Sequence, residues 1–226
     1  MTGDELHRLL RDCPVLWHMA EAGSWPSIRE HGLQSTSALL DRFGVTGEQR
    51  DAIESRQRPQ SVVLLDAFGA AVIRDNRPLG QEALADLLDD SLVPRDWYRL
   101  LNRRAFFWLK HDRLKTLMGA YPGRPHDVLE VDAASLVAAH RDEIELSPIN
   151  SGAIGRARAR RGKATFLPID EYPYETWRRK RGPRDRVVEL AVLGGVPDIA
   201  RHVSRVVRMR GGAEEAVLYE RSPPLG

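Results

Sequence analysis

Two residues with chemically useful side chains, His18 and Glu189, interrupt apolar strand-like segments of this chain. His18 lies in the segment "VLWHM" (15–19), and Glu189 lies in "VVELAVLGG" (187–195). Side-chain alternation leaves Glu189 in a strand that is apolar on both faces, where a carboxylate is costly unless it is paired, hydrogen-bonded or facing a ligand. We expect either a salt bridge to an arginine or a carboxylate held to bind a sugar hydroxyl or stabilise a developing cation. For His18 the alternatives are a core histidine donating to a carbonyl and a residue that lines a binding cleft.

A short helix is predicted directly after the histidine strand. Ser24 is a suitable N-cap, Pro26 suits the first turn, and Gly32 suits a left-handed helix end. A strand that ends in a tight connection to a helix commonly forms the floor of a binding cleft.

Several familiar kinds of site have no signature in this sequence. G-x-G-x-x-G after a strand, G-x-x-x-x-G-K-[ST], H-E-x-x-H and G-x-S-x-G are all absent. The seven histidines show no metal-ligand spacing, and the single Cys13 provides neither a disulfide nor a cysteine metal site. We therefore expect no metal, and either metal-free chemistry or none.

A basic segment, residues 147–186, has no sustained helical or strand period and is predicted to be a functional loop. Between Gly155 and Arg186 there are eleven Lys or Arg and four Asp or Glu, a net charge of +7, so the rest of the +2 chain carries −5. Guanidinium groups grip phosphates and aromatic rings stack on bases, which favours single-stranded nucleic acid as the partner. A solvated surface or a localisation-like run, "RRKRGPR", is the alternative. The candidate nucleic-acid-binding residues are Arg156, Arg158, Arg160, Arg161, Lys163, Tyr174 and Trp177.

The whole chain of 226 residues is predicted to be one α+β domain, with helices dominant in its first half. "SVVLL" (61–65) is interpreted as a strand or the start of a buried helix. Because no apolar run approaches the roughly 18 residues of a membrane span and no signal peptide is evident, we expect a reduced, cytoplasmic setting without membrane contact. Helices are predicted at 4–11, 37–44, 47–58, 81–92, 94–104, 111–121 and 133–144, and strands at 105–109, 127–132, 187–195 and as a pair within 202–221.

The order of these motifs resembles the ADP-ribosyltransferase fold, most of all the DarT-type toxins that modify nucleic acid. The likeness spans about residues 14 to 200, with "KHDR" (110–113) where that family has Asn-Pro-Arg and with no equivalent of residues 37–100. The matching positions are Trp17-His18, Trp25, Ile28 and Gly32-Leu33, then Phe106-Phe107-Trp108 with Arg113, then Asn150, and finally Val188-Glu189-Leu190, Val196-Pro197 and Ile199.

The resemblance implies a mixed sheet around an NAD cleft and a mono-ADP-ribosyltransferase that consumes NAD and modifies nucleic acid, with single-stranded DNA bases as first acceptor. Glu189 would bind the nicotinamide-ribose 2′-hydroxyl, stabilise the oxocarbenium-like transition state and act as base. Residues 37–100 would be a helical insertion and 147–186 the basic substrate loop, with an antitoxin hydrolase as a further partner. Protein or RNA 2′-phosphate acceptors, and a non-catalytic nucleic-acid-binding module, remain alternatives. The implied NAD-binding residues are His18, Trp17, Phe107, Arg113 and Asn150.

Overall fold

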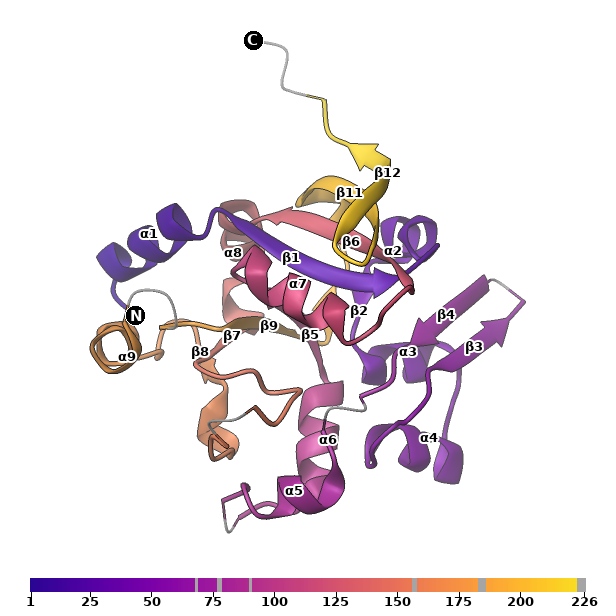
Figure 1. Ribbon diagram of the computed structural model, residues 1–226, viewed down its shortest axis with the longest axis horizontal. Helices are drawn as coiled ribbons and strands as arrows, with labels where there is room; N and C mark the ends of the chain where they lie inside the picture. The colour runs from indigo at the N-terminus through magenta and orange to yellow at the C-terminus, as the bar shows by residue number, and fades with distance from the viewer. Residues whose placement is uncertain (68, 77–78, 90, 156–157, 183–185, 223–226) are drawn as a thin grey trace.

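An antiparallel sheet of eight strands organises the fold, as Figure 1 shows. The computed structural model describes residues 1–67, 69–76, 79–89, 91–155, 158–182 and 186–222. Helices and strands mix along this chain around one large sheet, so the predicted α+β class is confirmed. Across the sheet the strands follow the order β12 (Ala213–Glu220), β11 (Val203–Arg210), β6 (Pro125–Asp132), β1 (Val15–Glu21), β5 (Arg104–Trp108), β9 (Glu189–Leu193), β7 (Ile144–Ser147) and β8 (Leu167–Pro168).

Helices and short strand pairs surround this sheet. Two smaller antiparallel pairs are β10 (Gly195–Val196) with β2 (Leu33–Gln34), and β3 (Val62–Asp66) with β4 (Gly69–Ile73). The α-helices are α1 (Gly3–Asp12), α2 (Trp25–His31), α3 (Thr36–Arg42), α4 (Gly47–Glu54), α5 (Gln81–Ala85), α6 (Pro94–Asn102), α7 (His111–Gly119), α8 (Ala133–His140) and α9 (Tyr174–Arg181), and the 3₁₀ turns are η1 (Arg141–Glu143), η2 (Lys163–Thr165) and η3 (Ile199–Arg201).

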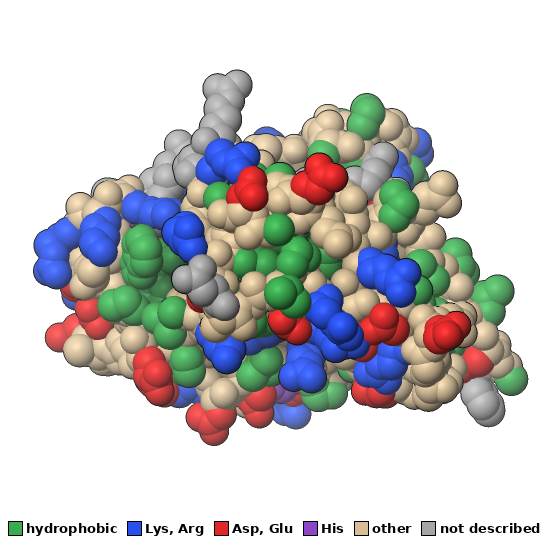
Figure 2. Space-filling model, turned by 90° about the horizontal axis from the view of Figure 1, so that it is seen from below, with side chains coloured by type: hydrophobic (Ala, Val, Ile, Leu, Met, Phe, Trp, Pro, Cys, Tyr) green, Lys and Arg blue, Asp and Glu red, His purple; other side chains and the backbone are tan. Residues whose placement is uncertain are grey.

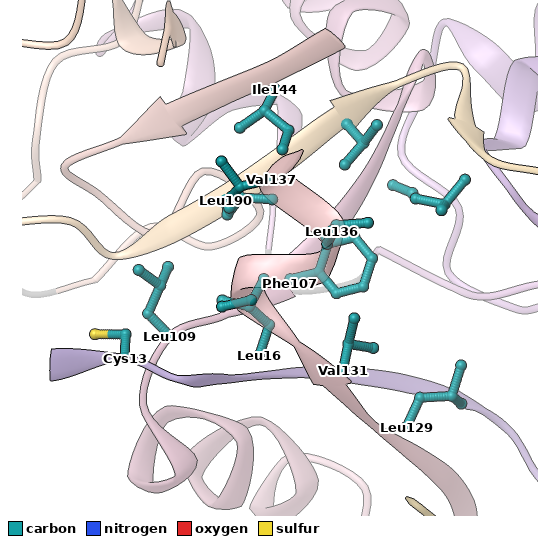
Figure 3. Packing of buried hydrophobic residues seen from close by; sticks show 14 of the residues in the cluster. Cys13, Leu16, Phe107, Leu109, Leu129, Val131, Leu136, Val137, Ile144 and Leu190 are labelled. Carbon is teal, nitrogen blue, oxygen red and sulfur yellow. The ribbon is translucent and has the colours of Figure 1, made fainter. Parts of the chain in front are cut away.

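The main core lies between α8 and one face of the sheet. Phe107 of β5 and Leu136 of α8 lie against one another there, surrounded by aliphatic side chains from neighbouring strands (Figure 3). Both side chains are almost fully buried, and each such residue contributes on the order of 2 kcal/mol by leaving water. On the opposite face α7 covers β1, with Met19 and Leu114 in a second apolar cluster. The sheet is therefore fixed on both sides around the strands that carry His18 and Glu189.

Residues 37–100 are not helical throughout, which corrects the expectation of a helical insertion. Residues 62–65 lie in β3, which confirms the strand alternative for this segment, and β3 pairs with β4 as a hairpin. The helix expected over 81–92 ends at Ala85, and Leu87 then follows in a turn. Helices α3, α4 and α6 are present, so the described part of residues 37–100, the segment expected to be an insertion, is a mixed unit beside the sheet (Figure 1).

The described residues of the basic segment 147–186 are not all in a loop. The segment contains α9, which sequence periodicity missed because only Tyr174 and Trp177, three residues apart, face the main core. Its last turn holds four basic residues, which suit the negative end of the helix dipole. The predicted C-terminal strand pair is confirmed as β11 and β12, joined by Gly211 and Gly212. Among the described residues, no helix combines the length and apolar character needed to cross a bilayer.

Candidate active site

The site begins where the central sheet separates between β1 and β5. These strands pair at one position only, Trp17 with Trp108. Beyond this pair the two backbones diverge and the strand pairing stops. The His18 side chain bonds across the gap instead, because its Nδ1 lies 2.9 Å from the carbonyl oxygen of Phe106. Residues of both strands beside this gap, among them His18 and Phe106, line a cavity.

The cavity consists of two adjoining lobes that share part of their lining. The larger, of about 330 Å³, lies between β1, α2 and the β3–β4 hairpin of the insertion. The smaller, of about 250 Å³, lies over Glu189 and the backbone of 150–153. His18, Arg74 and Phe106 line both lobes, so His18 stands at their junction. The insertion 37–100 thus supplies one wall of the cavity.

His18 is held as a neutral hydrogen-bond acceptor. A carbonyl oxygen only accepts, so Nδ1 carries the hydrogen and Nε2 keeps its lone pair. Burial lowers the pKa of His18 to about 4, with the nearby charge of Arg74 acting in the same direction and the Phe106 hydrogen bond opposing it. The imidazole ring of His18 packs against the ring of Phe107, with centroids 5.7 Å apart, and this contact fixes the orientation of the imidazole. Both alternatives for His18 therefore hold: it donates to a carbonyl and it lines a cleft.

Glu189, at the start of β9, has 3% of its surface exposed. It lies on the same sheet face as its cross-strand partner Trp108, away from the main core. The backbone N–H of Ser151 donates to both carboxylate oxygens, at 3.2 and 3.1 Å. Burial raises the pKa of Glu189 to about 7, although the Ser151 hydrogen bonds and the charges of Arg113 and Arg161 lower it. Within the described part of the chain no arginine forms an ion pair with it, so the salt-bridge alternative is wrong.

Arg161 holds the loop that carries Ser151. Its guanidinium, 2% exposed, donates to the carbonyl oxygens of Asn150, Ala153 and Ala159 at 3.3, 2.6 and 2.6 Å. Its backbone exchanges hydrogen bonds with residues 87 and 89 of the insertion. One buried arginine therefore joins the insertion, the 150–153 loop and the carboxylate into a single arrangement.

Arg74, just after β4, brings a positive charge to both lobes. Its guanidinium lies over the ring of Tyr121, 4.7 Å from the centroid, and its Nη1 is 3.5 Å from the Met19 carbonyl oxygen. Its Nη2 is buried and has no hydrogen-bond partner among the described residues. Burial lowers the pKa of Arg74, although the nearby groups of Tyr121, Glu21 and Asp75 raise it. A buried guanidinium of this kind can donate a hydrogen bond to an anion in the cavity.

The structure brings together some of the residues expected to bind NAD and not others. Asn150 lines the small lobe beside Glu189, and Arg113 lies close enough to act on the Glu189 carboxylate. Trp17 stacks on His111 in the α7 cluster and lines neither lobe. Phe107 points into the main core, because alternation along β5 turns it away from the cavity (Figure 3). Its neighbour Phe106 lines both lobes instead.

The candidate nucleic-acid residues separate by burial. Arg161 and Tyr174 are buried, at 2% and 1% exposure, so the expectation that they contact a partner is wrong. Arg158, Arg160 and Lys163 are exposed, although Arg158 is 3.5 Å from Asp86 and Arg160 donates to the Leu88 carbonyl oxygen.

The remaining candidates lie in two places. Trp177 is half-buried beneath Lys180 and Arg181, whose charged groups lie 5.4 and 5.0 Å from its ring centroid. Figure 2 shows basic side chains gathered at the end of the molecule formed by α1 and α9. Arg156 lies outside the described residues.

Sequence reasoning missed Ser151 and Arg74. Ser151 acts through its backbone, for which a side-chain pattern gives no signal. Arg74 follows a strand, as "AVIRD", but nothing in its spacing relates it to His18 or Glu189. The signal that was available is a charge directly after an apolar strand, the position where strands commonly deliver functional groups.

Comparison with known proteins gives one family. The family model that matches, described as a family of unknown function (DUF7002), covers residues 14–203. The chain belongs to this family. No curated protein matches it. The matched range includes β1, the cavity-lining insertion and β9, so every residue of the candidate site lies inside the family's own domain.

Proposed function

We propose that this DUF7002 chain is a mono-ADP-ribosyltransferase that consumes NAD, with Glu189 as its catalytic carboxylate. The observation that carries the proposal is a buried, rigidly held carboxylate facing a cavity that also holds a neutral histidine. The proposal also rests on the resemblance of the sequence to this enzyme class. A catalytic role would explain why a carboxylate is kept in a buried position where it costs stability.

In the proposed reaction, the bond between the nicotinamide nitrogen and the ribose C1′ breaks, and an acceptor nitrogen or oxygen forms a bond to C1′. Nicotinamide leaves with the bonding electron pair, and the acceptor loses a proton. Ionised Glu189 accepts from the ribose 2′-hydroxyl, stabilises positive charge at C1′ and takes up the acceptor proton. Ser151 holds the carboxylate in place, so little reorganisation is needed when charge develops.

His18 and Arg74 would orient the dinucleotide. His18 offers Nε2 as an acceptor for a ribose hydroxyl at the junction of the lobes. Arg74 offers a buried N–H donor without a hydrogen-bond partner among the described residues, which suits a diphosphate oxygen. Lobes of about 330 and 250 Å³ provide room for the two halves of such a ligand.

We infer that nucleic acid is the acceptor, with single-stranded DNA first. Support comes from exposed Arg158, Arg160 and Lys163, which lie in the same basic segment, 147–186, as the cavity-lining residues 150–153. Basic groups beside a group-transfer site attract a polyanion and hold it by its phosphates. Burial of Arg161 and Tyr174 leaves fewer contacts than the sequence predicted, so the grip rests on a smaller set of side chains.

The test is mass spectrometry of single-stranded DNA, RNA and bulk protein after incubation with NAD. We expect an added ADP-ribose on one pool with the wild type, and a rate lower by about 10²-fold or more with Glu189→Gln. Glu143→Gln, an exposed carboxylate in η1, is the matched control and should act as wild type. The pool that gains mass identifies the acceptor. An unchanged mass in all three pools together with intact NAD would overturn the proposal.

A further inference from the structure

A second cluster of chemically useful side chains lies outside the cavity lining, where α8 meets the turn η3. His140, Asp198 and His202 bring one ligand atom each within 4.8 Å of the others. The expectation of no metal-ligand spacing came from sequence, where sixty-one residues separate the two histidines. Only the fold places them side by side.

His202 is the member whose geometry points to a ligand. It is 3% exposed, and its Nδ1 lies 2.7 Å from Ser135 Oγ, which fixes the ring. Its buried Nε2 lies 3.3 Å from Asp198 Oδ1, outside the geometry of a well-formed hydrogen bond. Metal-binding histidines are commonly arranged in this way, with one ring nitrogen held by an outer partner and the other facing the ion.

His140 completes the arrangement from the end of α8. Its Nε2 lies 2.6 Å from the same oxygen, Asp198 Oδ1. The rings of His140 and His202 are nearly perpendicular, at 82°, with centroids 5.4 Å apart, so both Nε2 atoms converge on the carboxylate. The Asp198 side chain is 34% exposed, which leaves an approach from solvent.

We propose that His140, Asp198 and His202 bind a zinc ion, with water as the fourth ligand. Two imidazole nitrogens and one carboxylate oxygen are a donor set that zinc accepts. The ion would join α8, packed on the main core, to η3, whose preceding strand β10 pairs with β2 beside the large lobe. This role is independent of the proposed transferase activity.

Metal content of the full chain tests the site. After incubation with zinc and removal of excess by gel filtration, we expect about one zinc ion per chain in the wild type. His140→Ala and Asp198→Asn should lose it, whereas His7→Ala, an exposed histidine on α1, should retain it. Free zinc at about 100 times Kd should raise the Tm of the wild type by about 5–10 °C.

Cobalt keeps the test decisive if a variant fails to fold. Wild-type protein loaded with Co²⁺ should show the intense visible absorption of a low-coordinate site, and equimolar zinc should remove it. The competing explanation is a cluster held by hydrogen bonds alone. That explanation predicts no retained zinc and no cobalt spectrum, and either result would overturn the proposal, as would zinc retained equally by Asp198→Asn.

Discussion

The backbone N–H of Ser151 donates to both carboxylate oxygens of Glu189, at 3.2 and 3.1 Å. These residues lie on different elements, one after β7 and the other at the start of β9, and their neighbour Ser147 pairs with Glu189 across the sheet. A carboxylate fixed by backbone cannot turn away from the cavity when a ligand enters. Its position is therefore set by the sheet and not by the flexibility of its own side chain.

Glu189→Gln should separate stability from activity. Between pH 4.5 and about 7 the native state binds a proton at Glu189 more tightly than the unfolded state, so the wild-type free energy of unfolding falls as pH rises. The glutamine amide is uncharged and avoids this loss. We expect the variant to be more stable by about 3 kcal/mol at pH 8, about 6–12 °C in Tm, with little difference near pH 4.5.

Thermal unfolding across this pH range, together with NAD turnover, measures both effects. A carboxylate kept only for structure would make the variant less stable at pH 8, which contradicts the proposal. Glu143→Gln, an exposed carboxylate in η1, is the control for the substitution itself.

The pH profile of NAD turnover should show a single ionisation near 7. The carboxylate must be ionised to stabilise a cation, and kcat/KM reports the free enzyme, so the rate should rise with pH through the pKa of Glu189. His18, with a pKa of about 4, stays neutral throughout and adds no second limb. His18→Gln should lower the rate without moving the midpoint. A flat profile from pH 5.5 to 8.5 would show that the ionisation of Glu189 does not control the rate, which contradicts its proposed role.

Much of the scaffold was accessible from the sequence, because strands such as 15–19 and helices such as 4–11 are marked by local periodicity and caps. His18 and Glu189 were predicted because a polar group in an apolar strand is costly. Their meeting in one cavity depends on strand order, which no local pattern encodes. Trp17 and Phe107 were expected to bind NAD, but their neighbours His18 and Phe106 line the cavity in their place. Which side chains face the cavity depends on the gap between β1 and β5, which the sequence does not show.

Arg74→Gln should weaken NAD binding more than catalysis. Losing a charge-assisted hydrogen bond to a diphosphate costs about 1.5–3 kcal/mol, so we expect KM for NAD to rise about 10-fold to 100-fold with a small change in kcat. Removing a buried charge should leave the Tm unchanged or raise it. Inhibition by ADP-ribose should weaken in parallel, whereas inhibition by nicotinamide should not.

Arg95→Ala, an exposed arginine at the start of α6, is the control for general loss of positive charge. Equal KM changes in both variants would show that Arg74 acts only through net charge.

Arg161→Ala and Lys163→Ala should fail in different ways. Arg161 donates to three carbonyl oxygens from a buried position, so its removal should cost about 2–4 kcal/mol and release Ser151 from Glu189.

Lys163 is exposed, and its removal should leave the Tm unchanged while weakening binding of single-stranded DNA. Each lost phosphate contact lowers the salt dependence of log K by about 0.7. Urea unfolding and fluorescence anisotropy at several salt concentrations measure the two effects, and a Lys163→Ala chain with wild-type affinity would remove this segment from the acceptor surface.

Gly32→Ala should destabilise the cavity wall through a backbone contact. A Cβ at Gly32 would lie 2.6, 2.7 and 2.9 Å from the Cα, oxygen and carbonyl carbon of Pro197, and backbone atoms cannot move away as the end of a side chain can.

Gly23 is a matched control: its φ of +88° is close to the +83° of Gly32, but its added Cβ would meet nothing within 4 Å. Both alanines would have to adopt a positive φ, so their difference reports chiefly the close approach of α2 to the segment after β10. We expect Gly32→Ala to be less stable than Gly23→Ala by about 1–3 kcal/mol in urea unfolding, because overpacking displaces the backbone. Since Gly32 also lines the large lobe, NAD binding should weaken in the same variant. Equal stability of the two variants would mean that this contact relaxes freely and that the wall is not rigid.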